Sequence, residues 1–218
     1  MSINSYYDYG HTFIRRVSDG APVLMTLQKM KGQGKTSIRG IVNKDGKEIV
    51  VGEVVYERFR SGIPADGYYG CKNNFPASCS YERYGIGKDI EGKVPKIFVE
   101  RLNNFDKRTY KEVGTQLMET VRRISLKDYK HGSKGRVQVE STKSAAPFYY
   151  KQGFRTMTPS DEISPAEVDQ IIERTIQNLP TEKQFKLSVH MYLPISTLNP
   201  TLIAEPIFFP KRKMSKAS

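Results

Sequence analysis

The stretch from Tyr110 to Arg123 reads YKEVGTQLMETVRR, and its pattern decides how the rest of the chain is interpreted. The apolar residues Val113, Leu117 and Val121 recur at helical spacing, which predicts an amphipathic helix over 113–129. A glycine stands in the first turn, and basic residues precede it. The first N–H groups of a helix have no intrahelical partner, and the helix dipole adds positive charge there. The junction therefore predicts an anion site.

The residues before this helix support the same interpretation. KIFVERL (96–102) reads as a buried strand, and a polar connection leads from it to Gly114. Because glycine has no Cβ, it permits close approach to the backbone. Arg108 and Lys111 would add charge at the rim. The alternative is that Gly114 only provides a permissive start for a helix.

The region upstream predicts a hairpin. Two β-branched runs flank Asp45 and Gly46, the pair of residue types that most readily forms a tight turn. We expect antiparallel strands over 36–43 and 48–58. VLMTLQKMK (23–31) fits neither period cleanly, so a third strand and a short helix both stay open.

The downstream half alternates strands with helices. The expected elements are a strand over 136–140, a short helix over 145–152, a strand from Phe154, a helix over 165–178 that begins with the capping box SPAE, and a strand over 184–193.

Composition sets the broad class. The chain has 218 residues, 38% of them hydrophobic, and a formal net charge of +12. This predicts a soluble, folded protein with no membrane segment, and the positive charge suits a polyanionic partner or a phosphorylated cofactor. We expect one domain over 1–210, with a long loop at 59–95 and a basic tail at 211–218. The N-terminus lacks a secretion signal and the chain has only two cysteines, which favours the cytoplasm. Cys71 and Cys79 lack metal-ligand spacing, so no metal is expected.

Three patches of this sequence resemble the GNAT superfamily of acyl-CoA N-acyltransferases. The segment from Lys111 to Gln116 occupies the family signature Q/R-x-x-G-x-G/A, and YKEVGTQLM looks like the common form YRGxGTxLM. SAAPFYYKQGF is similar to the family ending A-x-x-x-Y-x-x-x-G-F, which places Tyr149 at its tyrosine. VNKDGKEIVVGEVVY resembles the second and third strands of the family. The patches occur in the family's order over residues 36–154.

The resemblance implies an α/β (α+β) fold with a mixed, mostly antiparallel central sheet flanked by helices and a loop inserted between its third and fourth strands. It implies an N-acetyltransferase that uses acetyl-CoA as co-substrate. The implied acid is Tyr149, with Tyr150 a competitor, and the implied base is Glu100, with Glu57 a rival. The thioester would lie near Leu102 to Asn104, where the family's strand splays to admit the pantetheine arm. The implied cofactor-binding residues are Leu102, Asn104, Arg108, Lys111, Val113, Gly114, Thr115 and Gln116.

Two positions depart from the family pattern. Lys111 replaces arginine or glutamine and keeps a donor, whereas Gln116 replaces glycine or alanine and places a larger side chain near the expected pyrophosphate. Gln116 would either donate a hydrogen bond or crowd the site. In the second case the chain would be a catalytically inactive GNAT-like binding module with a basic surface for a polyanionic partner. The amine acceptor, whether small molecule, protein or RNA-linked, is not readable, and the oligomeric state, a homodimer included, is left open.

Overall fold

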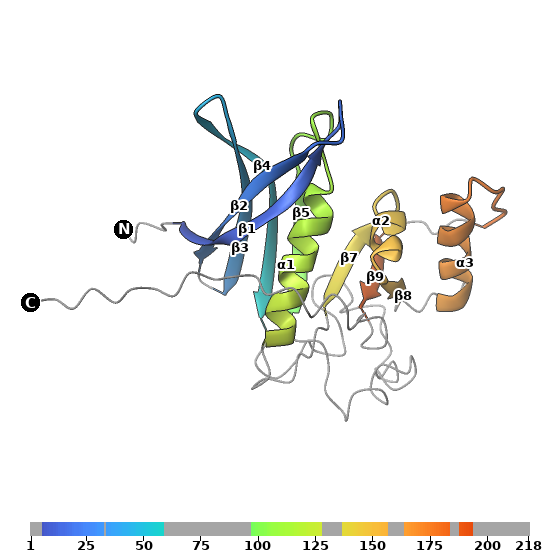
Figure 1. Ribbon diagram of the computed structural model, residues 1–218. Coiled ribbons are helices and arrows are strands. Elements are labelled where there is room, and N and C mark those ends of the chain that lie inside the picture. The colour runs from blue at the N-terminus through green and yellow to red at the C-terminus, as the bar shows by residue number, and fades with distance from the viewer. Residues whose placement is uncertain are drawn as a thin grey trace, which may run out of the picture. The chain divides into compact units, whose positions relative to one another are not determined.

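The computed structural model describes residues 6–32, 34–58, 97–127, 137–156, 164–183 and 188–193 of this chain. Figure 1 shows the elements. In chain order they are β1 (Tyr7–Arg16), β2 (Pro22–Lys31), β3 (Lys35–Lys44), β4 (Lys47–Arg58), β5 (Ile97–Asn104), β6 (Tyr110–Lys111), α1 (Val113–Lys127), β7 (Gln138–Thr142), α2 (Ala146–Lys151), β8 (Arg155–Thr156), α3 (Pro165–Ile176) and β9 (Ser188–Tyr192). The described chain is therefore mixed α/β, and most of its strand pairs are antiparallel.

The described residues fall into two compact units. The first holds the described residues up to Val55 together with Leu102–Leu117, and the second holds the described residues within 56–101 and 118–198. The boundary passes through β4, β5 and α1, so each of these elements contributes residues to both units.

The strands of the first unit follow the order β6-β1-β2-β3-β4. Pairing is antiparallel between β1 and β2, between β2 and β3, and between β1 and β6. The predicted hairpin is confirmed: β3 and β4 meet at Asp45 (φ 54°) and Gly46 (φ 78°), the left-handed conformations that a two-residue turn needs. The segment at 23–31, for which the sequence left both a strand and a short helix possible, is strand β2.

Strand β1 was not predicted from the sequence. Its burial alternates only weakly, and its pairing with β2 shifts register between Asp8 and Gly10. A bulge of this kind interrupts the period of two by which a strand is identified. The two-residue strand β6, which pairs with Arg15 and Arg16 of β1, is too short to leave a pattern.

The start of α1 packs directly on β4 in the first unit. A Cβ placed on Gly52 would lie 2.6 Å from Val113 Cγ1, 3.0 Å from Leu117 Cδ1 and 2.9 Å from the carbonyl oxygen of Asn103. Val113 and Leu117 are fully buried. The absence of a side chain at Gly52 therefore allows the first turn of α1 to approach the sheet closely.

The strands of the second unit follow the order β5-β7-β9-β8. β5 and β7 are parallel, and β9 is antiparallel to both β7 and β8. The two predicted helices are present as α2 and α3. Ser164 forms the predicted capping box with Glu167: each side chain bonds the other residue's backbone N–H. The apolar face predicted for the last strand is buried at Val189, Met191 and Leu193.

Several expectations lie outside the described residues. They are the loop at 59–95, the basic tail at 211–218, both cysteines and the start of the last strand. Within the described part of the chain, no helix is long and apolar enough to cross a membrane.

Candidate cofactor site

The strand-to-helix junction is built by β6, one left-handed residue and α1. Lys111 of β6 pairs with Arg15 of β1, and Glu112 then turns the chain with a φ of 69°. The first helical hydrogen bond runs from the N–H of Gln116 to the carbonyl oxygen of Glu112, at 2.9 Å. A non-glycine residue at positive φ is uncommon, and here it makes the turn from β6 into α1.

The amides of Val113 and Gly114 precede that first helical bond. No hydrogen bond from either amide is found among the described residues, as expected for a helix start. Both residues are buried, whereas Lys111 and Glu112 are exposed. An anion would therefore meet the exposed side chains before it reached the amides.

The side chain of Gln116 is held by β1. Thr12 donates its hydroxyl hydrogen to Gln116 Oε1 at 2.8 Å. The bond fixes the glutamine's carbonyl oxygen on the neighbouring strand, and Thr12 had not been identified from the sequence. A partner more than a hundred residues away leaves no local signal.

The charges around the junction are mixed. Arg15 Nε lies 3.5 Å from Glu112 Oε1, and both side chains are well exposed, at 60% and 45%. A carboxylate beside a helix start is favoured by the dipole, while an exposed pair contributes little to stability. Glu112 therefore already provides a negative charge where an anionic ligand is expected, and Arg15 partly offsets it.

The connection from β5 to β6 is an ordered turn. The N–H of Asp106 donates to Asn104 Oδ1 at 3.2 Å, and the Asp106 carboxylate accepts from Thr109 N–H at 3.0 Å. Leu102 and Asn104 are half-buried, and Arg108 is exposed. The predicted cofactor residues thus share the first unit, because all of them lie within Leu102–Leu117.

Tyr149 lies in the second unit, on the buried side of α2. Its ring makes edge contacts with Phe148 and Phe154, with centroids 5.1 and 5.5 Å apart. Burial raises the pKa of Tyr149 to about 12. The phenol therefore stays protonated near neutral pH and has a proton to give. Its competitor Tyr150 is only half-buried, and the guanidinium of Arg155 stacks on its ring at 4.2 Å.

The two carboxylates considered as bases differ in their surroundings. Glu100 is exposed on β5. Glu57 is half-buried near the end of β4, and its Oε2 is buried without a hydrogen bond. The exposed side chain is open to solvent, whereas the buried oxygen has an unmet need for a donor.

The parallel pairing between β5 and β7 is short. Its register contains Phe98 opposite Gln138 and Val99 opposite Val139. β5 then continues to Asn104 and β7 to Thr142, with β7 paired to β9 along its whole length. The register of this parallel pair therefore ends while both strands go on.

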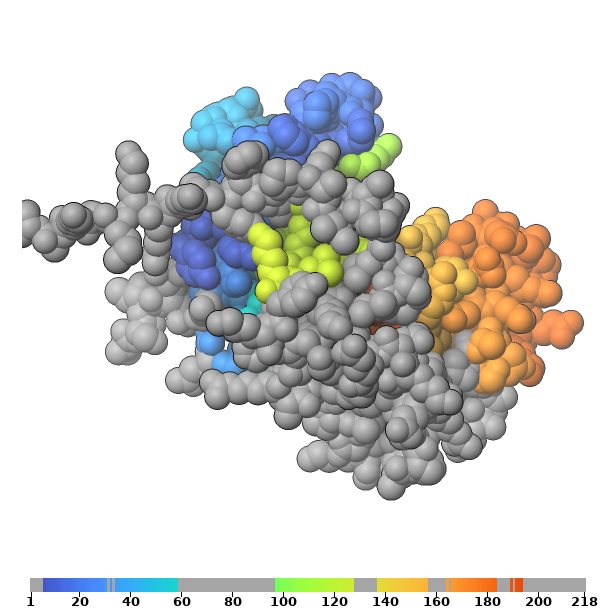
Figure 2. Space-filling model, turned by 60° about the horizontal axis from the view of Figure 1, so that its bottom comes forward, coloured from blue at the N-terminus to red at the C-terminus, as the bar shows by residue number. Residues whose placement is uncertain are grey.

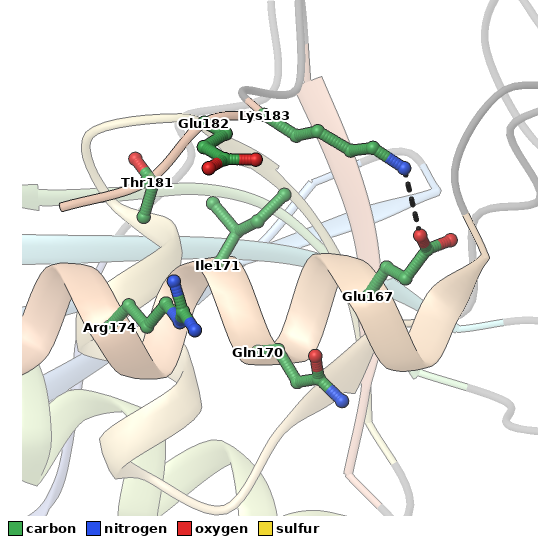
Figure 3. A pocket seen from close by; sticks show the side chains of 7 residues that line it. All are labelled: Glu167, Gln170, Ile171, Arg174, Thr181, Glu182 and Lys183. Carbon is green, nitrogen blue, oxygen red and sulfur yellow. Dashed lines mark hydrogen bonds and ion pairs between the residues drawn. The ribbon is translucent and has the colours of Figure 1, made fainter. Parts of the chain in front are cut away.

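Helix α3 carries two surface cavities, and its atoms lie at the surface in orange in Figure 2. The cavity in Figure 3, of about 250 Å³, is lined by Ile171 among charged side chains. Lys183 pairs with Glu167 there at 3.0 Å. The hydrogen bond from Ser164 N–H and this lysine lower the pKa of Glu167 to about 2. A second cavity of about 420 Å³ lies between α2 and α3 and includes Pro147 and Leu179.

Among the described residues, no group of three or more His, Cys, Asp or Glu side chains is placed to hold a metal ion. No protein-family model matches this chain, and neither does any curated protein.

Proposed function

We propose that this protein is a GNAT-type N-acetyltransferase that transfers the acetyl group of acetyl-CoA to a primary amine. The observation that carries the proposal is the short parallel register of β5 and β7. A parallel pair inside a mostly antiparallel arrangement, with a register that ends after Val99 and Val139 while both strands continue, is what the GNAT resemblance expects beside the pantetheine arm.

The junction at the start of α1 supports a seat for the pyrophosphate. Helix amides without helical partners, together with Arg108 and Lys111, supply donors and positive charge. The bond from Thr12 to Gln116 supports the seat further, because it holds the glutamine's carbonyl oxygen on β1. If the Gln116 oxygen pointed into the seat instead, it would repel a phosphate, because an amide oxygen is only an acceptor.

The proposed reaction needs only a proton donor and a carboxylate from the chain's own residues. Acetyl-CoA would supply an acyl carbon bonded to a sulfur leaving group. A neutral amine forms the C–N bond as the C–S bond breaks, and the thiolate receives a proton from Tyr149, which the amine's surplus proton then replaces. Because its pKa is about 12, Tyr149 holds that proton until sulfur takes it. Glu100 is exposed and can pass the proton of an ammonium acceptor to water.

The proposal is tested by calorimetric titration of acetyl-CoA into the wild type, Arg108→Glu and Lys111→Glu. Both residues are exposed, so the variants should fold. Reversal of a charge that meets a phosphate should weaken binding about tenfold or more, since charge-assisted hydrogen bonds contribute about 1.5–3 kcal/mol.

Lys44→Glu is the matched control, because it makes the same charge change at an exposed position of the β3–β4 hairpin. It should bind acetyl-CoA as the wild type does. If the folded wild type does not bind acetyl-CoA, the acetyltransferase proposal is wrong, and a basic binding module becomes the better account. Salt-dependent retention on a polyanion column would then support that module.

A further inference from the structure

Among the described residues of the second unit, the buried side-chain oxygens without a hydrogen-bond partner include two that act only as acceptors. They are Glu57 Oε2 on β4 and Gln138 Oε1 on β7. Gln138 is almost fully buried, at 2% exposed. Leaving a buried acceptor without a donor costs about 1–3 kcal/mol, and more for a charged group, so each such atom calls for an explanation.

Both residues lie at the same end of the strands. Phe105, just after β5, donates its N–H to the carbonyl oxygen of Val51 in β4, and Asn103 lies beside Gly52, so β5 begins near the end of β4. Glu57 is the last residue but one of β4, and Gln138 is the first residue of β7, level with Phe98 near the start of β5. The strand order places β5 between β4 and β7. With neighbouring strands about 4.8 Å apart, the backbones of Glu57 and Gln138 are about 10 Å from one another, within reach of a single ligand.

The alternation of side chains puts both residues on one face. Gly52 of β4 faces α1, so the odd-numbered Glu57 faces the other way. Val137, just before β7, lines a small space together with Met118 of α1, so the neighbouring Gln138 also faces away from that helix. The two oxygens therefore belong to the face turned away from α1.

The neighbours on this face are aromatic. Gln138 is paired with Phe98 on one side and with Tyr192 on the other. Phe98 is 3% exposed. Arg155, which is paired with Tyr192, directs its guanidinium to the carbonyl oxygen of Phe154, at 2.8 Å, and to the ring of Tyr150. A carboxylate, an amide oxygen and aromatic rings make a surface that accepts N–H donors and attracts a cation.

We propose that Glu57 and Gln138 form the polar end of a binding site for a primary ammonium group. An ammonium carries several N–H donors and a positive charge, so it can satisfy both buried oxygens and offset the negative charge of the half-buried Glu57. The assignment of this ligand as the acetyl acceptor rests on the proposed function. The site would then select amines and assign Glu57, rather than the exposed Glu100, as the residue that holds the acceptor nitrogen.

The first test is the stability of the unliganded protein. Glu57→Met keeps the length of the side chain and removes the unpartnered charge, so its thermal midpoint should equal or exceed that of the wild type. Gln138→Met should behave in the same way. A midpoint lower by about 5 °C or more in either variant would show that the chain itself satisfies these oxygens, and the site would be refuted.

The second test is ligand binding, with propylammonium chloride as the probe. It should raise the midpoint of the wild type by about 4 °C at ten times its dissociation constant. Tetramethylammonium chloride has the same charge but no N–H donor, and it should not. Glu57→Met and Gln138→Met should lose the response to propylammonium, whereas Glu48→Met, an equal charge change at an exposed position of the same strand, should keep it. Equal responses to the two salts would overturn the proposal.

Acetyl-CoA separates this inference from the proposed function. Both proposals are supported if acetyl-CoA stabilises the wild type and Glu57→Met equally while propylammonium raises the midpoint of the wild type alone. If propylammonium raises the midpoint of the wild type alone and acetyl-CoA stabilises neither protein, the ammonium site is supported and the acetyltransferase proposal fails. If acetyl-CoA stabilises both and propylammonium stabilises neither, only the ammonium site is refuted.

Discussion

Among single residues, Tyr149 links the stability of the folded chain to alkaline pH. Burial against Phe148 and Phe154 raises its pKa to about 12. A tyrosine in the unfolded chain has a pKa of about 10. Between these values the unfolded chain has released the proton and the folded chain still holds it, so the free energy of unfolding falls as the pH rises.

We expect Tyr149→Phe to remove this alkaline loss. Across pH 10 to 12 the wild type should lose about 2–3 kcal/mol more than the variant, because two pKa units correspond to about 2.7 kcal/mol. Urea unfolding of both proteins at pH 8, 10 and 12 measures the difference, and comparison with the variant cancels the titration of the other tyrosines and lysines. Parallel losses in the two proteins would show that the Tyr149 hydroxyl is not desolvated.

The predicted motif has partners on a distant strand that its own sequence does not indicate. The positions Lys111 to Gln116 could be selected because a helix start has a local pattern. Thr12, which bonds Gln116, and Arg15, which pairs with Glu112, belong to β1 and were not selected. Their contacts depend on a pairing between distant strands, and one sequence carries no signal of that pairing.

Among the elements, the packing of α1 on β4 fixes where the candidate seat lies. Gly52 leaves no room for a side chain beside Val113, Leu117 and the carbonyl of Asn103. Gly52→Ala should therefore cost about 1–3 kcal/mol of stability, as overpacking does, and should weaken acetyl-CoA binding by displacing the first turn of α1. Urea unfolding and calorimetric titration measure the two effects.

Gly32→Ala is the control for this change. Its new Cβ would meet only the Lys35 carbonyl oxygen, at 3.4 Å, so little destabilisation is expected. If Gly52→Ala were as stable as this control, the close contact between helix and strand would be refuted.

The elements that the sequence predicted correctly share strong local chemistry. The turn at Asp45 and Gly46, the stripe of α1 and the capping box of α3 each specify a structure within a few residues. β1 was not predicted because the bulge at Gly10 interrupts the alternation of its side chains. Its solvent face also carries an apolar residue, Phe13, which is 59% exposed. A strand with an apolar residue on its solvent face does not show the pattern of a half-buried strand.

At the scale of the whole molecule, the net charge of +12 favours anionic ligands without choosing among them. The proposed function makes the choice, because it assigns the anion to the junction at the start of α1. A general attraction of polyanions would weaken steeply with salt and would not depend on any one position. Binding of acetyl-CoA at a specific seat should instead depend on the backbone amides of Val113 and Gly114.

The central claim is tested most directly by the amide NMR signals of Val113 and Gly114 during a titration with acetyl-CoA. Both signals should shift and saturate with the ligand, and acetyl-pantetheine, which lacks the pyrophosphate, should leave them much less changed. If both signals stay in place while the protein is folded and acetyl-CoA is in excess, the start of α1 is not the seat of a coenzyme, and the acetyltransferase account is contradicted.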